Sequence, residues 1–147
     1  MKFIHKKKKK HNEKIIKYIF TSKWMKSLAL KSKIIKDENT EVIGCGIDFK
    51  NWYPINKFEA KKKLGIKTTK NTILFSAFGL KNKRKGFKNL INELKETKDQ
   101  FKLIISSDQK PDKIDKLDFI FFDDITNIEQ RRLIYSSADI CVVPSTQ

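Results

Sequence analysis

A run of basic residues beside a glycine is the part of this sequence whose residue types most clearly suggest a chemical function. Arg84 and Lys85 precede Gly86, and residues 73–77 before them form an apolar run typical of a buried strand. A helix is predicted to begin at Gly86, and the N-terminus of a helix favours anions over cations. Two cations at this place therefore indicate an anion-binding loop, in preference to an ordinary solvated helix start.

Other side chains that could carry chemistry form weaker patterns. Asp123 and Asp124 are adjacent carboxylates, but they fall between a predicted strand and a helix cap. Solvation, or contact with the base of a ligand, is favoured there over acid–base catalysis. His5 and His11 lie in a lysine-rich tail and form no catalytic constellation.

The two cysteines exclude some chemistry by their spacing. Cys45 and Cys141 are far apart and belong to no Cys-x-x-Cys pattern, which argues against a disulfide framework and a metal site. Reduced thiols in a cytoplasmic protein are the default expectation. Cys45 is expected to be a small buried residue.

The net charge of +16 allows a nucleic-acid or phosphate-binding module as an alternative function. The cations are concentrated in the first half of the chain, and Arg84, Arg131 and Arg132 are the only arginines. Proteins that bind bases and phosphates in bidentate fashion rely on arginine, so this composition disfavours specific nucleic-acid recognition. Contact with an anionic membrane surface is compatible with the charge, since polybasic segments gain free energy there.

Hydropathy bounds the location of the protein. No apolar run approaches the ~18 residues that a spanning helix needs. The N-terminal lysine cluster is not followed by an apolar region, so it is not a signal peptide. We expect a cytoplasmic protein that can lie at the inner face of the membrane.

From residue 72 onward, apolar runs alternate with helical patterns. Strands are predicted at residues 73–77, 101–106, 119–122 and 140–144, and helices at 86–98 and 126–137. Thr126 and Glu129 have the spacing of a capping box at the start of the second helix. Strands alternating with helices at this spacing predict an α/β fold with a doubly wound, Rossmann-like parallel sheet.

The preceding residues predict smaller elements. Residues 15–20 favour a short buried strand, and Thr21 and Ser22 can cap a helix with an apolar stripe. That stripe comprises Trp24, Met25, Leu28 and Ala29. Residues 41–43 predict a second short strand, and residues 58–64 a helix that Gly65 ends.

Three segments, taken in this order, resemble motifs of one enzyme family. Residues 21–25 (Thr-Ser-Lys-Trp-Met) resemble the opening of a helix late in its N-terminal domain. Residues 42–48 with Pro54 resemble its hinge, although Cys45 replaces the usual Asn and Gly44 a common Pro. Residues 135–145, Tyr-Ser-Ser-Ala-Asp-Ile through Pro-Ser, resemble its "Y-x-x-A-D … P-S" segment. The family is that of the retaining GT-B glycosyltransferases (group 1, family 4 type), which are built from two Rossmann domains.

The resemblance implies a domain organisation. Residues 1–40 would comprise a basic tail and the last strand and helix of the N-terminal acceptor domain. Residues 41–57 would form the hinge, and residues 58–147 the first half of the nucleotide-sugar-binding C-terminal domain. The family's Glu-x7-Glu signature would begin just beyond Gln147, so we expect a truncated chain, inactive alone, whose catalytic residues are unknown.

The resemblance also implies site residues. In relatives, a basic pair reached from the loop after the first strand contacts the donor diphosphate. Lys85 matches one member, whereas the other position is occupied by Ala77-Phe78, and Arg84 is our candidate substitute. Loops at the carboxyl ends of the strands supply the further candidates for contact with the donor or its base: Gly79, Ser107, Asp124 and Ser145.

The function implied is the transfer of a sugar from a nucleotide-sugar donor to a glycan or lipid-linked acceptor in surface polysaccharide biosynthesis. No metal and no cofactor is expected. Two alternatives stay open at this point. One is the small basic nucleic-acid or phosphate-binding module, and the other is an inactive remnant of the transferase.

Overall fold

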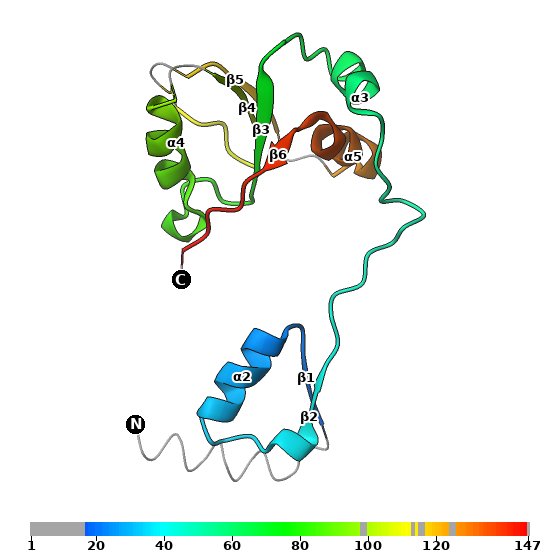
Figure 1. Cartoon of the computed structure of the whole chain (residues 1–147), viewed down its shortest axis with the longest axis vertical. Coiled ribbons are helices and arrows are strands. Elements are labelled where there is room, and N and C mark those ends of the chain that lie inside the picture. The colour runs from blue at the N-terminus through cyan, green and yellow to red at the C-terminus, as the bar shows by residue number, and fades with distance from the viewer. Residues whose placement is uncertain (1–16, 98–99, 113, 115–116, 124–125, 147) are drawn as a thin grey trace. The chain divides into compact units, whose positions relative to one another are not determined.

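The computed structural model describes residues 17–97, 100–112, 114, 117–123 and 126–146, and the chain divides into two compact units. The first unit is Met1–Ile47 and the second is Asp48–Gln147 (Figure 1). The division falls within the predicted hinge. The assignment of the two units to the acceptor and donor domains of a longer enzyme stays a prediction.

In its described residues, 17–47, the first unit consists of a two-stranded parallel sheet and one α-helix. Strand β1 (Tyr18–Phe20) pairs with β2 (Thr40–Val42), and α2 (Lys23–Lys31) and the 3₁₀ turn η1 (Asp37–Asn39) lie between them in the chain. Ser22 is the N-cap of α2, where its Oγ accepts a hydrogen bond from the Met25 N–H at 3.1 Å. The predicted apolar stripe is present, but Trp24, Met25 and Leu28 are exposed. Cys45 is also exposed, so the expectation that it is a buried residue was wrong.

The second unit is built on a four-stranded parallel sheet. The chain forms α3 (Lys57–Lys63), β3 (Asn71–Ser76), η2 (Lys83–Lys85), α4 (Phe87–Lys95), β4 (Phe101–Ser106), β5 (Phe119–Phe122), α5 (Ile128–Ser137) and β6 (Ile140–Cys141). The strand order is β5-β4-β3-β6, and all three pairings are parallel. The α/β fold with a parallel, Rossmann-like sheet is thereby confirmed.

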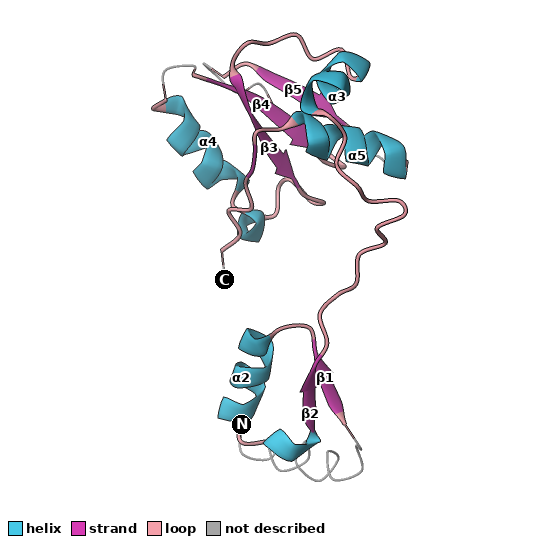
Figure 2. Cartoon of the chain, turned by 45° about the vertical axis from the view of Figure 1, so that its right-hand side comes forward, coloured by secondary structure: helices cyan, strands magenta, loops and turns pink. Residues whose placement is uncertain are grey.

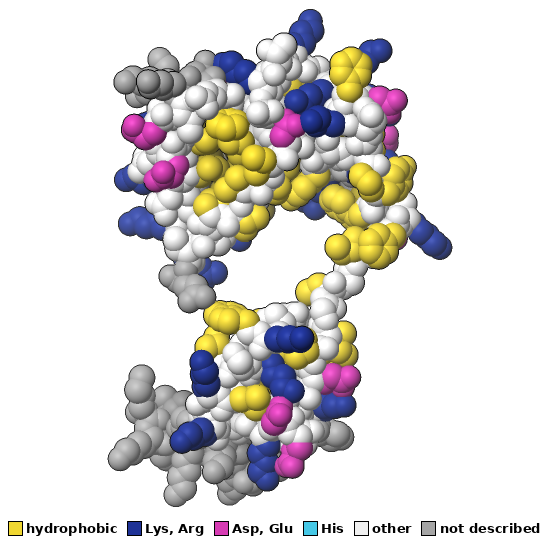
Figure 3. Space-filling view, in the orientation of Figure 1, with side chains coloured by type: hydrophobic (Ala, Val, Ile, Leu, Met, Phe, Trp, Pro, Cys, Tyr) yellow, Lys and Arg dark blue, Asp and Glu magenta, His cyan; other side chains and the backbone are white. Residues whose placement is uncertain are grey.

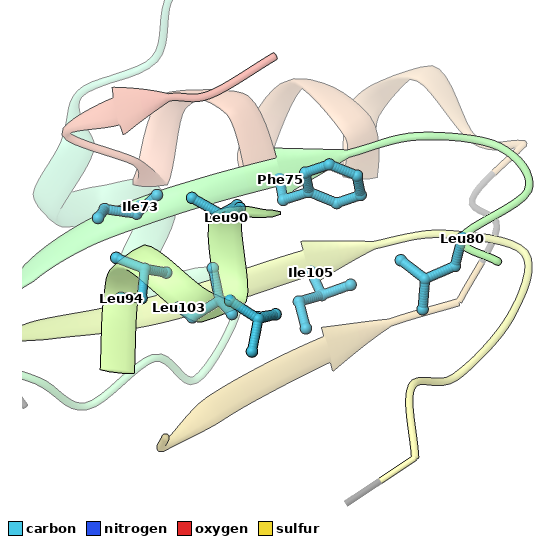
Figure 4. Packing of buried hydrophobic residues seen from close by; sticks show 8 residues of the cluster. Ile73, Phe75, Leu80, Leu90, Leu94, Leu103 and Ile105 are labelled. Carbon is cyan, nitrogen blue, oxygen red and sulfur yellow. The ribbon is translucent and has the colours of Figure 1, made fainter. Parts of the chain in front are cut away.

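Helices cover both faces of this sheet because its central strands are apolar on both sides (Figure 2). On one face, Ile73 and Phe75 of β3 pack with α4 through Leu90 and Leu94 (Figure 4). Leu103 and Ile105 of β4, Leu80 and Ile91 complete this cluster. On the other face, the intervening residues Leu74 and Ile104 pack against Ile134 of α5 and Ile66, which follows α3.

The edge strand β6 differs from its prediction. A strand was expected at residues 140–144, whereas only Ile140–Cys141 pairs as a strand, beside β3. Ile140 is 51 % exposed and Val143 is 75 % exposed, so apolar side chains of this segment lie at the surface. β6 lies at the edge of the sheet, so one side of its backbone has no neighbouring strand among the described residues. Figure 3 shows hydrophobic side chains at the surface between α4 and β6.

The N-terminus of α5 also differs from its prediction. The N-cap is Asn127 and not Thr126, because the Asn127 side chain accepts hydrogen bonds from the N–H groups of Glu129 and Gln130. Asn is as good a cap as Ser or Asp and better than Thr, so the shift of one residue is favoured. We expect Asn127→Ala to lower the unfolding free energy by about 1 kcal/mol and Thr126→Ala by clearly less, measured by urea denaturation. The opposite ranking would restore Thr126 as the cap.

Asp139 joins three parts of the second unit. Its Oδ2 accepts hydrogen bonds from the N–H of Thr72 at 2.8 Å and from the Thr72 Oγ1 at 2.7 Å, while its Oδ1 binds the Lys57 Nζ. Lys61 adds a second ion pair at 3.6 Å. These partners, Lys57 first, hold the pKa of Asp139 well below its usual range. These contacts give Asp139 a structural role in the second unit.

Among the described residues, no helix is long and apolar enough to cross a membrane.

Candidate functional site

A cavity of about 530 Å³ opens where strands β3 and β4 end. Ser76 is the last residue of β3 and Ser106 is the last of β4, and the two are register partners. Parallel strands present their carboxyl ends at one edge, so the residues that follow them lie together. The cavity is lined by Trp52, Ser76, Ala77, Phe78, Lys85, Ser106, Ser107, Asp108, Arg131 and Tyr135.

Asp108 joins the loops that follow the two strands. Its Oδ1 accepts hydrogen bonds from the Gly79 N–H at 2.6 Å and from the Ser107 Oγ at 3.0 Å. Gly79 can present its N–H in this way because it adopts a positive φ of 73°, which glycine tolerates best. Ser107 is itself buried, and its N–H donates to the carbonyl oxygen of Phe122. The Asp108 carboxylate therefore holds together the loops that follow β3 and β4 at the cavity.

The loop from Gly79 to Gly86 carries Lys85 to the cavity through successive turns. The Asn82 N–H donates to the Gly79 carbonyl at 2.8 Å, and the Lys85 N–H donates to the Asn82 carbonyl at 2.9 Å. The Asn82 side chain accepts the N–H of Arg84 at 3.0 Å and so begins η2. These backbone bonds define where the Lys85 side chain starts.

Gly86 lets the C-terminal segment pass against this loop. Gly86 has a φ of 70°, and a Cβ there would lie 1.9 Å from the carbonyl oxygen of Pro144. Nearby, the Thr146 N–H donates to the Arg84 carbonyl at 2.8 Å. No side chain would fit between the two segments, so glycine is required for both conformation and space.

Arg131 supplies a second cation to the cavity wall. It lies in the first turn of α5, and that helix follows strand β5. A helix that follows a parallel strand begins near the carboxyl edge of the sheet, so its first turn faces the same region as the strand ends. Sequence reasoning treated Arg131 only as a component of charge. Its place in the first turn after a predicted strand is the signal that could have identified it.

Aromatic side chains complete the wall on the α5 side. Trp52 and Tyr135 pack edge to face, with ring centroids 6.1 Å apart and planes at 87°. The neighbouring Arg132 contacts residues that precede α3. Its guanidinium lies 3.9 Å from the centroid of the Tyr53 ring, and its Nη1 donates to the Asn51 carbonyl at 3.1 Å. Arg132 therefore attaches residues 51–53 to α5.

The structure distributes the six predicted site residues unevenly. Lys85 and Ser107 line the cavity, and Gly79 contacts the lining residue Asp108. Among the described residues that line it, Arg84 and Ser145 do not appear, although both lie on the segments that meet at Gly86. Asp124 lies outside the described residues. The ligand contacts assigned to all six stay predictions.

The parallel sheet, its helices on both faces and the cavity at its carboxyl edge define a Rossmann-like α/β unit. Comparison with solved structures shows that the fold is glycosyltransferase-like. A sucrose-phosphate synthase from Thermosynechococcus elongatus has a similar solved structure, with a TM-score of 0.69 and 23 % sequence identity. The match covers 86 % of this chain and 34 % of that one, so the chain spans about a third of the synthase's length. No family model and no curated protein sequence matches the chain.

Proposed function

We propose that this chain forms the donor-binding part of a glycosyltransferase that transfers a sugar from a nucleotide-sugar to a glycan or lipid-linked acceptor. Synthesis of a surface polysaccharide is the process we propose for it. The observation that carries the proposal is that Lys85 and Arg131 line one cavity at the carboxyl ends of β3 and β4. The glycosyltransferase-like fold supports it, because ligands of such sheets bind at that edge.

The two cations would act on the diphosphate of the donor. When the bond between the sugar's anomeric carbon and the diphosphate oxygen breaks, the bonding electrons leave with that oxygen. Cations already in place there stabilise the developing negative charge. Lys85 offers a mobile point charge and Arg131 a planar group suited to two phosphate oxygens. The proposal assigns the charge to side chains and requires no metal ion.

The neutral part of the wall would contact the rest of the donor. Trp52 and Tyr135 offer apolar surface, which suits the flat face of a base or a sugar ring. Asp108 would act as a positioning residue, because its Oδ1 is occupied by Gly79 and Ser107. Arg84 stays a candidate for the second cation, and it competes with Arg131 for that role.

Calorimetric titration with UDP and GDP tests the assignment. Lys85→Ala and Arg131→Ala should each weaken nucleoside-diphosphate binding by about 1–3 kcal/mol, the usual size of a charge-assisted hydrogen bond. Lys63→Ala is the matched control, because Lys63 is an exposed lysine on α3 and is absent from the described lining. It should change the affinity little, since exposed charges are screened at physiological salt.

The variant Arg84→Ala decides between the two candidates for the second cation. A loss of nucleoside-diphosphate affinity for Arg131→Ala with none for Arg84→Ala would support Arg131 as the second cation. The reverse pattern would favour Arg84 and remove Arg131 from the proposal. Equal small losses for every variant, the control included, would indicate diffuse attraction of the kind expected from a generic phosphate or nucleic-acid module, and the donor site should then be abandoned.

A further inference from the structure

A second hollow, of about 890 Å³, lies on the α4 side of the second unit. Three segments form it: the loop before α4, one face of α4, and the residues that follow β4. We call it the α4 groove. Its basic lining residues are Lys81, Lys83, Lys88, Lys95 and Lys110. Figure 3 shows basic side chains projecting along the α4 side of this unit.

The charge of the α4 groove is largely uncompensated. None of its five lysines forms an ion pair with another residue in the described part of the chain. Asp112 is the one carboxylate among the described lining residues. Glu93 and Glu96 belong to α4 or its end but are absent from that lining, whereas Lys88 and Lys95 lie two turns apart on one face. Several cations on one surface with a single lining carboxylate among the described residues favour a polyanionic partner.

Apolar groups lie among the lysines. Phe87, Pro111 and Ile114 line the α4 groove and are partly buried, and Leu80 and Ile91 beneath them belong to the core. The lining is therefore amphipathic, with flexible ammonium groups around an apolar base. Lysine side chains place apolar stems on such a base while their charges stay in water.

This combination favours an anionic lipid surface over a nucleic acid. The described lining contains no arginine for bidentate contacts, and its one aromatic residue, Phe87, is partly buried against Phe75. Nucleic-acid grooves usually offer both arginine and exposed stacking rings. Lysines suit the diffuse negative charge of phospholipid headgroups, where each contributes to binding independently.

We propose that the α4 groove docks this unit onto the anionic phospholipid headgroups of a membrane surface. The five lysines contact headgroup phosphates, and the apolar base faces the interface between headgroups and acyl chains. The proposal is independent of the donor cavity, since neither Lys85 nor Arg131 lines the α4 groove.

Vesicle co-sedimentation of the full chain tests the proposal. The probes are phosphatidylcholine vesicles with and without about one third phosphatidylglycerol. The groove variant carries Lys81→Ala, Lys83→Ala, Lys88→Ala and Lys95→Ala. The control variant carries Lys50→Ala, Lys62→Ala, Lys63→Ala and Lys67→Ala, which remove the same charge from exposed lysines of the same unit.

We expect the unaltered chain to bind only the anionic vesicles, with the groove variant losing at least about tenfold in partition coefficient and the control much less. Similar losses in both variants would overturn the proposal, because they would show that net charge alone drives binding. Retained binding by the groove variant would overturn it as well.

A second arm identifies the source of the phosphate. Soluble tripolyphosphate and single-stranded RNA are titrated against the same chain and variants. Groove-dependent binding of either one, without groove-dependent binding of vesicles, would replace the membrane with that polyanion as the partner. An unchanged circular dichroism spectrum and an unchanged urea unfolding midpoint in the groove variant would show that the unit is folded and that the loss is local.

Discussion

Replacing Gly86 with alanine should lower the unfolding free energy of the second unit by about 2–4 kcal/mol, measured by urea denaturation. Two costs add at this residue. Its φ of 70° disfavours any side chain, and the new Cβ would lie 1.9 Å from the carbonyl oxygen of Pro144. Because the obstacle is backbone, relief requires the C-terminal segment to move away from the loop.

Gly65 provides the control that separates these two costs. It has nearly the same φ, 68°, but nothing lies within 4 Å of a Cβ built on it. Gly65→Ala should therefore show the conformational cost alone, about 1–2 kcal/mol. The excess loss in Gly86→Ala measures the close approach to Pro144. Equal losses for the two variants would mean that the two segments do not meet as described.

Replacing Asp139 with asparagine should lower the unfolding free energy by about 2–3 kcal/mol near neutral pH. The substitution removes the negative charge of Asp139 and with it the ion pairs to Lys57 and Lys61. The effect should exceed that of a surface pair, since the Asp139 side chain is only 18 % exposed and its partner Thr72 is fully buried. Thermal or urea unfolding at fixed salt measures it.

The same carboxylate should make stability depend on pH in acid. The folded-state pKa of Asp139 is lowered below the unfolded value of about 3.9, so the unfolded chain binds the proton more readily. Its stabilisation is present above that unfolded pKa, and it declines as the pH falls through the range below about 5. Asp139→Asn should flatten this part of the stability profile.

Asp118 is the matched control for the loss of stability. It also pairs with a lysine, Lys102, but its side chain is 61 % exposed. We expect Asp118→Asn to cost about 0.5 kcal/mol or less. An Asp139→Asn variant that behaved like this control would contradict the structural role assigned to Asp139.

The sequence was sufficient to predict the central strands because their apolar runs are uninterrupted. Strand β4 occupies residues 101–106 and β5 residues 119–122, as predicted, since a strand buried on both faces has few alternatives. Predictions were less accurate where the choice between adjacent residues determines the start or the length of an element. Asn127 displaced Thr126 as the cap of α5, and β6 paired over two residues only. Such details depend on neighbours that local patterns do not identify.

The candidate site could be predicted only in part for a similar reason. The loop that carries Lys85 has a local signature, namely a strand, basic residues and a glycine. The signature of Arg131 is weaker, namely its place at the start of a helix that follows a predicted strand, and its role depends on α5 beginning near the carboxyl edge of the sheet. The carboxylate of Asp108 was missed because its partner Gly79 lies 29 residues earlier in the chain. Contacts between distant segments require the folded arrangement.

The loop from Gly79 to Gly86 is fastened near both ends, to Asp108 at Gly79 and to the C-terminal segment at Arg84 and Gly86. Its conformational entropy is therefore lost when the unit folds, before any ligand arrives. A ligand that meets Lys85 needs to immobilise a side chain but not the backbone that carries it. Preorganisation of this kind raises affinity without adding a contact to the ligand. Residues 144–146 therefore contribute to the affinity by holding the loop in place, although they need not touch the ligand.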